Sequence, residues 1–391
     1  MRLFLHALGA SAGGGLTYLR NVVPHLAAHP DIETWLLAGS DAALSVPPSA
    51  SHIHLVDCAS GGRGTISRFL WEQREIPRLL RKNAADVLFC AGNFAIWRSP
   101  VPQILFSRNS LYTSKEFARD LRGRGDYILL TDTWLKGLIA RKSAQRAELN
   151  VAPSEAFAQE VRTWARRDVI ALHHGFDREQ FFQDAQPLPA LMQEKLARTA
   201  GSVRLLFVSH YNYYRNFETL LRGFALLKQR RQDQKVSLVL TCELEPGKNP
   251  GRYRTEGAKA LVRELGIGDQ VVQLGAVPYP LLHHVYRSCD VYVTPAYTET
   301  FAHPLVEAMA SGLPIVASDL AVHREIAGDA ALFFDRFSPE DLADKVAQVI
   351  DSSSLQAECR TAGLRQIENF SWKVHVEKVI ELAQGLTRRS A

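Results

Sequence analysis

An α/β protein with two parallel β-sheets is the fold class that the sequence predicts. Short apolar runs alternate with amphipathic helical stretches along the 391 residues, which is the pattern of βαβ units whose sheet is covered by helices on both faces. The chain is also long enough for two domains of ordinary size, each with its own core. Between Asp177 and Ser202, Gln-Pro-Leu-Pro and a short charged helical stretch interrupt the alternation. We therefore expect a domain boundary near residues 185–200.

The first domain, residues 1–190, is expected to form one sheet. Its strands are short apolar runs, and helical stretches separate most of them. The expected strands are Leu3–Ala7, Thr34–Ala38, His52–Val56, Val87–Cys90, Gln103–Phe106, Leu149–Ala152 and Val169–Leu172. One intervening helix, Arg68–Lys82, is basic, aromatic and amphipathic. We expect it to pack on the sheet, with contact to a membrane surface as the alternative.

The second domain, residues 191–370, repeats the pattern. Its expected strands are Arg204–Ser209, Ser237–Thr241, Val271–Leu274, Asp290–Thr294, Ile315–Ala317 and Ala331–Phe334. The helices between them are expected to begin near Phe217, Thr255, Leu281, Pro304, Pro339 and Leu355. The remaining residues, 371–391, are expected to form an amphipathic closing helix.

Composition places the chain among globular proteins. Hydrophobic residues make up 46% and charged residues 22%, so nothing indicates a disordered or fibrous class. Five cysteines, an odd number without a Cys-x-x-Cys pair, argue against a disulfide scaffold or a zinc site. The first residues resemble a buried strand rather than a secretory signal, and no run approaches the roughly 20 apolar residues of a membrane span. A cytoplasmic location fits these features best.

The net positive charge is concentrated in the first half of the chain. The net charge is +5 at pH 7, and residues 1–190 hold 22 Lys and Arg against 18 Asp and Glu. The basic residues gather in three groups, Arg119–Arg124, Arg141–Arg146 and Arg162–Arg167. This half suits an anionic acceptor or an anionic membrane surface, although solvated helix faces explain the same groups. No basic-aromatic motif of a nucleic-acid-binding module is present.

Two glutamates, eight positions apart, carry the strongest functional signal. They enclose the run Glu299-Thr-Phe-Ala-His-Pro-Leu-Val-Glu307, in which the first follows an expected strand and the second lies about two turns into a helix that begins near Pro304. Ionised carboxylates accept hydrogen bonds from adjacent hydroxyls, and a helix start offers N–H groups to a phosphate. The pair suits an elongated polyhydroxylated ligand, while two solvated glutamates are the plainer interpretation.

The segment around these glutamates resembles the Glu-x7-Glu motif of retaining nucleotide-sugar glycosyltransferases, the glycosyl transferases group 1 (family 4-like). The shared features are the spacing, Phe301, Pro304, the run Glu-Ala-Met-Ala-Ser-Gly and the strand Pro-Ile-Val-Ala-Ser. The resemblance covers nearly the whole chain and is specific from about residue 203 to 335. It implies the glycosyltransferase B (GT-B) fold, in which two Rossmann-like domains have parallel sheets that face each other across a cleft. It also implies that the closing helix, residues 371–391, crosses back to the first domain.

The resemblance assigns catalytic roles to three residues. Glu299 is expected to hold sugar hydroxyls of the donor, and Glu307 its ribose. In the loop His210-Tyr-Asn-Tyr-Tyr-Arg215, relatives carry an Arg at the first position and a Lys at the second, which neutralise the donor diphosphate. Here these are His210 and Arg215, and Arg215 is the stronger candidate because histidine titrates near pH 6.5 while a guanidinium stays charged. We expect Glu299, Arg215 and His210 to be catalytic.

Further donor contacts are implied in the second domain. The loop around Val277 is expected to carry the nucleotide base through backbone contacts. The residues implied beside the transferred sugar and phosphate are Thr300, Phe301, Ala302, His303 and Leu305. Relatives usually have glycine at the position of Ala302, so the backbone conformation there is a point to check.

The first domain offers two weaker matches. Gly14 and Gly15 end a glycine-rich turn after the first strand and match the diphosphate-side loop of the family. The Gly-x-Gly-x-x-Gly fingerprint of dinucleotide binding is not met, and a plain flexible turn is the alternative. Arg108 and Asn109 follow a strand where many relatives carry a His near the donor sugar. A salt bridge or a turn cap would explain these two residues as well.

The family-like interpretation is a retaining glycosyltransferase that moves a hexose-type sugar from a nucleoside diphosphate to a hydroxyl of a glycan or lipid-linked saccharide, as in polysaccharide biosynthesis. The sequence contains no Asp-x-Asp clamp, zinc ligand set or catalytic triad, so we expect neither metal nor cofactor. The enzyme is expected to be cytoplasmic, with peripheral contact to the inner face of the membrane. The alternatives are a non-catalytic nucleotide-sugar-binding subunit and, less favoured because the dinucleotide fingerprint is missing, a Rossmann oxidoreductase.

Overall fold

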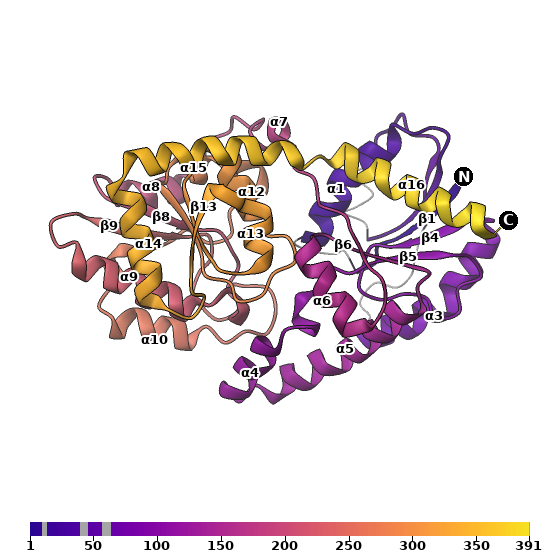
Figure 1. Cartoon of the computed structure of the whole chain (residues 1–391), viewed down its shortest axis with the longest axis horizontal. Helices are drawn as coiled ribbons and strands as arrows, with labels where there is room; N and C mark the ends of the chain where they lie inside the picture. Colours follow the sequence, from indigo (N-terminus) through magenta and orange to yellow (C-terminus); the bar gives the residue numbers. More distant parts are fainter. Residues whose placement is uncertain (10–13, 40–45, 57–63, 391) are drawn as a thin grey trace. The chain divides into compact units, whose positions relative to one another are not determined.

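The computed structural model describes residues 1–9, 14–39, 46–56 and 64–390, which divide into two compact units (Figure 1). Unit 1 comprises Met1–Thr113, Thr131–Gly175 and Ser371–Ala391, and unit 2 comprises Ser114–Leu130 and Phe176–Phe370. This division differs from the expected boundary at residue 190 in two respects. Unit 2 begins earlier, at Phe176, and it also takes residues 114–130 from the first half of the sequence.

Unit 1 is built on a parallel sheet. Within the described residues this sheet has seven strands in the order β3-β2-β1-β4-β5-β6-β7. Their bounds are β1 Arg2–His6, β2 Glu33–Leu37, β3 Ile53–Leu55, β4 Val87–Cys90, β5 Gln103–Phe106, β6 Leu149–Ala152 and β7 Ile170–Ala171. Strands β4 and β5 are buried at every position, as expected for a parallel sheet with both faces covered.

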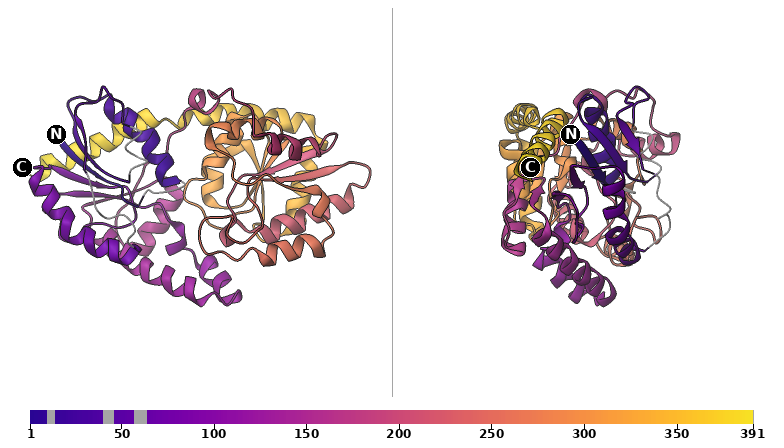
Figure 2. Two further views of the ribbon diagram at one scale, coloured as in Figure 1. Left: turned by 180° about the vertical axis from the view of Figure 1, so that it is seen from behind. Right: turned by 90° about the vertical axis from the view of Figure 1, so that its right-hand side faces the viewer.

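Helices pack on the sheet of unit 1 (Figure 2). They are α1 Gly14–Ala27, α3 Thr65–Lys82, α5 Tyr127–Arg146, α6 Glu155–Ala165 and α16 Trp372–Ser390, with the short 3-10 helix η1 Ser110–Tyr112. In α3, Phe69, Ile76 and Leu80 are buried, which confirms that the helix expected at Arg68–Lys82 packs on the core. The closing helix α16 packs against α1 and places Trp372 in the hydrophobic core of unit 1.

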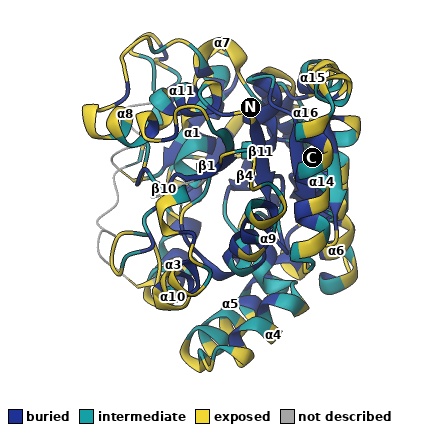
Figure 3. Ribbon diagram, turned by 90° about the vertical axis from the view of Figure 1, so that its left-hand side faces the viewer, coloured by how far each residue is buried: buried dark blue, intermediate teal, exposed yellow. Residues whose placement is uncertain are grey.

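Unit 2 has a parallel sheet of its own. The described residues give it six strands in the order β10-β9-β8-β11-β12-β13. Their bounds are β8 Val203–Phe207, β9 Val236–Leu240, β10 Val271–Gln273, β11 Val291–Thr294, β12 Ile315–Ser318 and β13 Ala331–Phe334. Strands β9, β11 and β12 are buried throughout. Figure 3 shows the same pattern, with buried residues on the strands and on the inner sides of the helices.

Many short helices connect these strands. The α-helices of unit 2 are α4 Lys115–Gly123, α7 Arg178–Phe181, α8 Ala190–Ala197, α9 Phe217–Arg230, α10 Glu256–Glu264, α11 Leu282–Arg287, α12 His303–Ala310, α13 Ala321–Ala327, α14 Pro339–Asp351 and α15 Ser353–Gln366. The 3-10 helices are η2 Tyr213–Arg215, η3 Gly268–Gln270, η4 Tyr279–Leu281, η5 Gly328–Ala330 and η6 Ile367–Asn369. Helix α13 was not expected, because it is short and its first turn lacks a side-chain cap.

Two further expectations concern the whole chain. In the described residues, no helix is both long enough and apolar enough to cross a lipid bilayer. Cys90, Cys242, Cys289 and Cys359 are free and buried, and Cys58 lies outside the described residues.

Candidate functional site

The carboxyl ends of β8 and β11 meet at the centre of the sheet in unit 2. These strands pair in parallel, with Leu206 beside Tyr292, and the order of strands along the sheet changes direction between them. In open parallel sheets, ligands bind outside the carboxyl ends of the strands at such a switch point. His210 and Arg215 lie in the loop after β8, and Glu299 lies in the loop after β11. The topology thus brings the predicted catalytic residues to one edge of the sheet.

Arg215 and Glu299 form a buried ion pair at this edge. Arg215 ends η2, which Asn212 caps by accepting a hydrogen bond from the Arg215 backbone N–H at 3.2 Å. The Nη1 of Arg215 donates to Oε2 of Glu299, and the two side chains are 17% and 12% exposed. The sequence predicted both residues but not their pairing, because they are 84 positions apart.

Both groups of this pair are charged. Burial raises the pKa of Glu299, but Arg215 and the Thr300 N–H, which donates to Oε1 at 3.0 Å, bring that pKa below its ordinary value. Burial lowers the pKa of Arg215, but Glu299 outweighs it and the net shift is upward. The Nε of Arg215 is buried and has no hydrogen-bond partner among the described residues. An anionic ligand beside the guanidinium would therefore find a donor that the protein does not use.

The loop from Glu299 enters α12 through an alanine in a strained conformation. Ala302 has φ 65° and ψ 62°, the left-handed region that costs an L-residue roughly 1–2 kcal/mol. Glycine, which relatives usually carry here, adopts this region without that cost. The backbone therefore keeps a conformation suited to glycine even though the residue is alanine.

The start of α12 offers fewer N–H groups to a phosphate than the sequence suggested. Pro304 has no N–H, and the N–H of Leu305 donates to the carbonyl oxygen of Ala302 at 2.9 Å. The side chains of Phe301 and Leu305 are buried, so only the backbone of these two residues can face a ligand. Arg215 is then the main positive group at this edge, supported by the positive end of the helix dipole.

Glu307, in the second turn of α12, has a different environment from Glu299. It is 4% exposed, and its Oε2 accepts a hydrogen bond from the Tyr286 hydroxyl at 2.8 Å. Burial raises the pKa of Glu307 to about 7, although the Tyr286 hydrogen bond opposes the shift. Tyr286 lies in the short helix α11, where no sequence pattern marked it as part of a site.

A buried histidine lies close enough to the Arg215–Glu299 pair to respond to its charges. His323 in α13 is fully buried, and its Nδ1 is 3.0 Å from the backbone oxygen of Ser318. Because a carbonyl only accepts, Nδ1 carries the proton. Burial lowers the pKa of His323 to about 4, with Glu299 opposing and Arg215 assisting. The ring is therefore neutral at pH 7.

His210 adds no permanent charge to the site. It is exposed in the loop after β8, and partial burial of the ring and the nearby Arg215 lower its pKa. The imidazole is therefore neutral at pH 7. Val277 lies half-buried between β10 and η4, where only its backbone was expected to act. Among the described residues, no three His, Cys, Asp or Glu side chains gather as metal ligands would.

Residues 114–130, which we call the arm, contribute contacts that the sequence did not reveal. Phe117 in α4 is fully buried, and its ring meets the Tyr214 ring edge-on at 6.1 Å. The guanidinium of Arg215 lies 5.3 Å from the centroid of the same Tyr214 ring. The Tyr297 hydroxyl donates to the Asp120 carboxylate at 2.7 Å. The arm therefore packs directly behind the loops that carry Arg215 and Glu299.

In unit 1, Gly14 and Gly15 open α1 after the end of β1, and residues 10–13 of the glycine-rich turn lie outside the described residues. Arg108 follows β5 and is held in place by unit 1 itself. Its Nη2 donates to the carbonyl oxygen of Ala91 at 2.6 Å, and its guanidinium lies 4.7 Å from the Tyr18 ring centroid. A role of Arg108 at the donor sugar stays a prediction.

Asn109 acts as a turn cap. Its side-chain oxygen accepts a hydrogen bond from the Leu111 N–H at 3.0 Å and so caps η1. This is the alternative that the sequence left open for this residue. A donor contact from Asn109 would have to use its remaining amide N–H groups.

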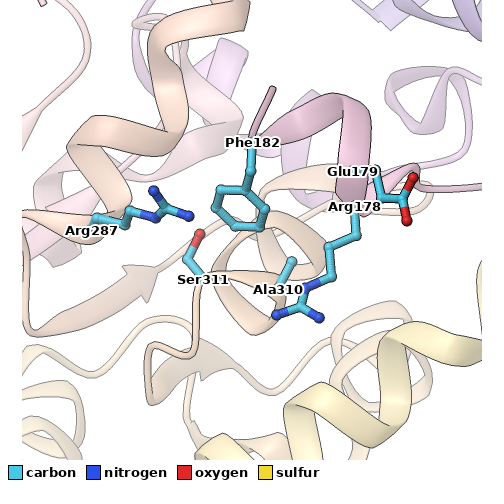
Figure 4. Close-up of a pocket in the computed structure, with 6 residues that line it drawn as sticks. All are labelled: Arg178, Glu179, Phe182, Arg287, Ala310 and Ser311. Carbon is cyan, nitrogen blue, oxygen red and sulfur yellow. The ribbon is translucent and has the colours of Figure 1, made fainter. Parts of the chain in front are cut away.

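A separate pocket of about 340 Å³ lies at the other end of α12 (Figure 4). Its lining residues are Arg178, Glu179, Phe182, Arg287, Ala310 and Ser311. The guanidinium of Arg287 stacks 4.5 Å from the Phe182 ring centroid, and the Glu179 carboxylate points away from the ring. The two arginines complement the negative C-terminal end of α12. The pocket contains none of the predicted site residues.

The two parallel α/β sheets define a structural class, the GT-B fold. Sucrose-phosphate synthase from Thermosynechococcus elongatus has a similar structure, with a TM-score of 0.77 at 16% identity over 100% of both chains. The structure of Anabaena HepE in complex with UDP-glucose has a TM-score of 0.73 at 16% identity, over 99% of this chain and 100% of that one. These structures confirm the predicted fold.

Sequence comparison finds a family match in part of the chain. Residues 191–366 match the family model described as glycosyl transferases group 1, the family that the segment around the Glu-x7-Glu motif resembles. The D-inositol 3-phosphate glycosyltransferase of Thermomonospora curvata is 30% identical over 195 residues, which are 49% of this chain and 45% of that protein. The matched part thus spans less than half the length of this relative.

Proposed function

We propose that the protein is a retaining glycosyltransferase that moves a hexose from a nucleoside diphosphate to a hydroxyl of a glycan or lipid-linked saccharide, without a metal ion. The observation that carries this proposal is the buried Arg215–Glu299 pair at the carboxyl ends of β8 and β11. Buried ion pairs add little to stability on balance. Its position where parallel sheets bind ligands therefore favours a role in function. The group 1 family match over residues 191–366 supports the same activity.

In this proposal the donor diphosphate binds beside Arg215. The free Nε of Arg215 supplies a charge-assisted hydrogen bond to a phosphate oxygen, and the α12 dipole adds favourable potential. The phosphate then competes with Glu299 for the guanidinium. Glu299 stays ionised, because its pKa is low, and it can accept hydrogen bonds from two hydroxyls of the transferred sugar.

Glu307 is proposed to hold the ribose. Its Oε2 is engaged by Tyr286, which leaves Oε1 as the acceptor for a ribose hydroxyl. With a pKa of about 7, Glu307 is divided between its neutral and ionised forms at neutral pH. Hydroxyl donors from the ribose favour the ionised form, because a carboxylate accepts hydrogen bonds more strongly than a carboxylic acid.

Catalysis in this proposal rests on positioning and on stabilising charge. As the bond to the sugar breaks, negative charge develops on the leaving nucleoside diphosphate, and Arg215 with the α12 dipole is placed to stabilise it. A phosphate oxygen of the leaving group accepts the proton of the incoming hydroxyl, which delivers the acceptor to the face that the phosphate leaves. The anomeric configuration is thereby retained.

The nature of the substrates is also proposed from the relatives. HepE is described in complex with UDP, and with UDP-glucose, so UDP is the first nucleotide to test. The name of the Thermomonospora curvata relative contains a phosphorylated polyol, D-inositol 3-phosphate, and the basic first half of this chain suits an anionic acceptor as well. We place the reaction in the cytoplasm.

A nucleotide-sugar-binding subunit without turnover is the second candidate. It is favoured by one observation, the neutral and exposed His210 at a position where relatives have an arginine. Such a subunit would bind the nucleoside diphosphate and leave a nucleotide sugar intact.

Calorimetric titration of the protein with UDP, GDP and ADP in the presence of EDTA tests the proposal. Saturable binding of one of them, lost or weakened at least about tenfold in Arg215→Met, is the expected result. Glu264→Gln, an exposed change at the end of α10, serves as the control. Proton NMR of the products from the matching nucleotide sugar then separates the two candidates, because only the enzyme releases nucleotide and only a retaining enzyme preserves the anomer. No nucleotide binding in EDTA would contradict the proposed metal-free site.

A further inference from the structure

Helix α5 has its small residues inside and its large apolar residues outside. Within unit 1, the buried side of the helix consists of Gly137, Ala140, Ser143 and Ala144. The opposite side exposes 64% of Trp134, 40% of Leu135 and 45% of Leu138. An ordinary surface helix buries its large apolar side chains and turns polar ones to solvent. The reversed pattern in α5 therefore needs a cause other than the stability of unit 1.

Close packing fixes the orientation of α5. A Cβ atom on Gly137 would lie 3.7 Å from the Tyr112 side chain, an ordinary van der Waals distance, so there is no room here for a large side chain. One helical turn and a half further on, the Trp97 indole N–H donates to the Ser143 hydroxyl at 3.2 Å. Turning Trp134 or Leu138 inward would displace these contacts and break the Trp97–Ser143 hydrogen bond. The exposed apolar face is therefore a fixed feature of the fold.

The same helix carries a basic end. Residues 133–146 contain Lys136, Arg141, Lys142 and Arg146 but no Asp or Glu. Lys136 pairs with Asp132 at 2.6 Å. Lys142, whose ammonium lies 4.5 Å from the Trp97 ring centroid, and the exposed Arg146 have no ion pair among the described residues. The outer face thus runs from aromatic and aliphatic side chains to uncompensated positive charge.

We propose that this face, the α5 stripe of Trp134, Leu135, Leu138, Lys142 and Arg146, docks on an anionic lipid surface. Residues 134, 138 and 142 follow one another at helical i, i+4 spacing, and Leu135 and Arg146 flank them. An amphipathic helix of this kind lies in the membrane interface with its apolar side chains among the acyl chains and its basic side chains at the lipid headgroups. Tryptophan is the side chain most suited to that boundary, because its ring is apolar and its N–H is polar.

This inference deepens the proposed function and rests on it for its biological meaning. A stripe on unit 1 that holds the protein to a bilayer favours a lipid-linked saccharide over a free glycan as the acceptor. It also assigns the membrane contact to α5 instead of α3, the helix for which the sequence suggested such a contact. Helix α3 buries most of its apolar face, whereas α5 leaves its apolar face open.

Vesicle flotation with the full chain tests the stripe. Phosphatidylcholine vesicles with and without phosphatidylglycerol are mixed with the wild type and with Trp134→Ser/Leu138→Ser. The wild type is expected to float with the anionic vesicles only, and the double variant to partition at least about tenfold more weakly, because it loses most of the buried apolar area. Arg146→Gln should weaken binding by about fivefold at low salt, since each basic residue adds roughly 1 kcal/mol at an anionic surface.

Val374→Ser provides the matched control. Val374 is an apolar residue of unit 1 that is 61% exposed and lies on α16 rather than on α5, and its variant should float like the wild type. Nucleotide affinity, measured by calorimetry without vesicles, should be the same in all variants. This result would show that each variant is folded and that the donor site does not depend on the stripe.

Three outcomes would overturn the inference. The wild type could remain unbound on anionic vesicles while it still binds nucleotide, which would leave the proposed function intact. The double variant and Val374→Ser could bind equally well. Finally, light scattering could show that the wild type is a dimer and that the double variant is a monomer, which would assign the stripe to a second copy of the chain instead of lipid.

Discussion

Glu299, in the loop after β11, and Glu307, in the second turn of α12, are eight positions apart and differ in their ionisation at neutral pH. Glu299 pairs with a guanidinium and keeps a low pKa, whereas Glu307 has only a phenol as partner and its pKa rises to about 7. Both are largely buried. The difference shows that the partner, rather than burial, sets the charge of a carboxylate in this site.

Removing Arg215, the ion-pair partner of Glu299, should give the largest change in the free energy of unfolding. Arg215→Met leaves the carboxylate buried without its cation and should lower the free energy of unfolding by about 3–5 kcal/mol at pH 7. Because a depressed pKa stabilises the protein above the unfolded value and this contribution is lost as pH falls, the difference from the wild type should shrink toward pH 4. Urea unfolding of the variant and the wild type between pH 7 and pH 4 measures this difference in stability.

The double variant Arg215→Met/Glu299→Gln is the matched control for this change. It removes the unpaired charge and should recover much of the lost stability at pH 7. If Arg215→Met were as stable as the wild type, or if the double variant were less stable than the single one, the pair would not determine the charge of Glu299.

The raised pKa of Glu307 should make the free energy of unfolding fall as pH rises, which is the opposite of the dependence expected from Glu299. Its neutral form is favoured in the folded state, so this contribution to stability is complete below the unfolded pKa of about 4.5 and is lost as pH rises through about 7. The loss should amount to about 2–3 kcal/mol. Glu307→Gln should remove it, and the difference between the two unfolding curves from pH 4.5 to 8 measures it. Parallel curves would refute the raised pKa.

Tyr286→Phe should have a smaller effect on the same region. The hydroxyl donates to Glu307 at 2.8 Å, and its loss should cost about 1–2 kcal/mol at pH 8. The cost should be lower at pH 5, where Glu307 is protonated and depends less on a donor. Thermal unfolding at the two pH values gives the comparison, and an equal loss at both would mean that the tyrosine acts only through packing.

The smallest expected effect concerns the loop between the two glutamates. Ala302→Gly should relieve the left-handed strain and raise stability by up to about 1 kcal/mol, since part of the gain is offset by the entropy of glycine. Ala308→Gly, in the interior of α12, should instead destabilise by about 1 kcal/mol or more. Chemical denaturation of both variants checks the two signs. A loss of stability in Ala302→Gly would contradict the assigned strain.

The fold could be predicted from local pattern because the strands of these sheets are short apolar runs and helices separate most of them. Val87–Cys90, Gln103–Phe106 and Ala331–Phe334 were predicted to the residue. The arm could not be predicted, because its helix α4 has a polar sequence whose partners, such as Tyr297, lie far away in the chain. Tertiary contacts alone assign it to unit 2.

The candidate site also has a part that the sequence predicted and a part that it did not. Glu299, Glu307 and Arg215 were recognisable from motifs within single segments, whereas their partners were not. The pairing of Arg215 with Glu299 and the hydrogen bond from Tyr286 to Glu307 arise from strand order and helix packing. The exposed apolar face of α5 could not be predicted either, because apolar residues in a sequence are expected to be buried.

Titration of the wild type and Glu299→Gln with the nucleoside diphosphate that the wild type binds tests the central claim most directly. If Arg215 is shared between Glu299 and the donor diphosphate, the variant frees the guanidinium and should bind the nucleotide as tightly as the wild type or up to about tenfold more tightly, while transfer of the sugar is lost. Nucleotide binding weakened tenfold or more, with transfer retained, would contradict the account.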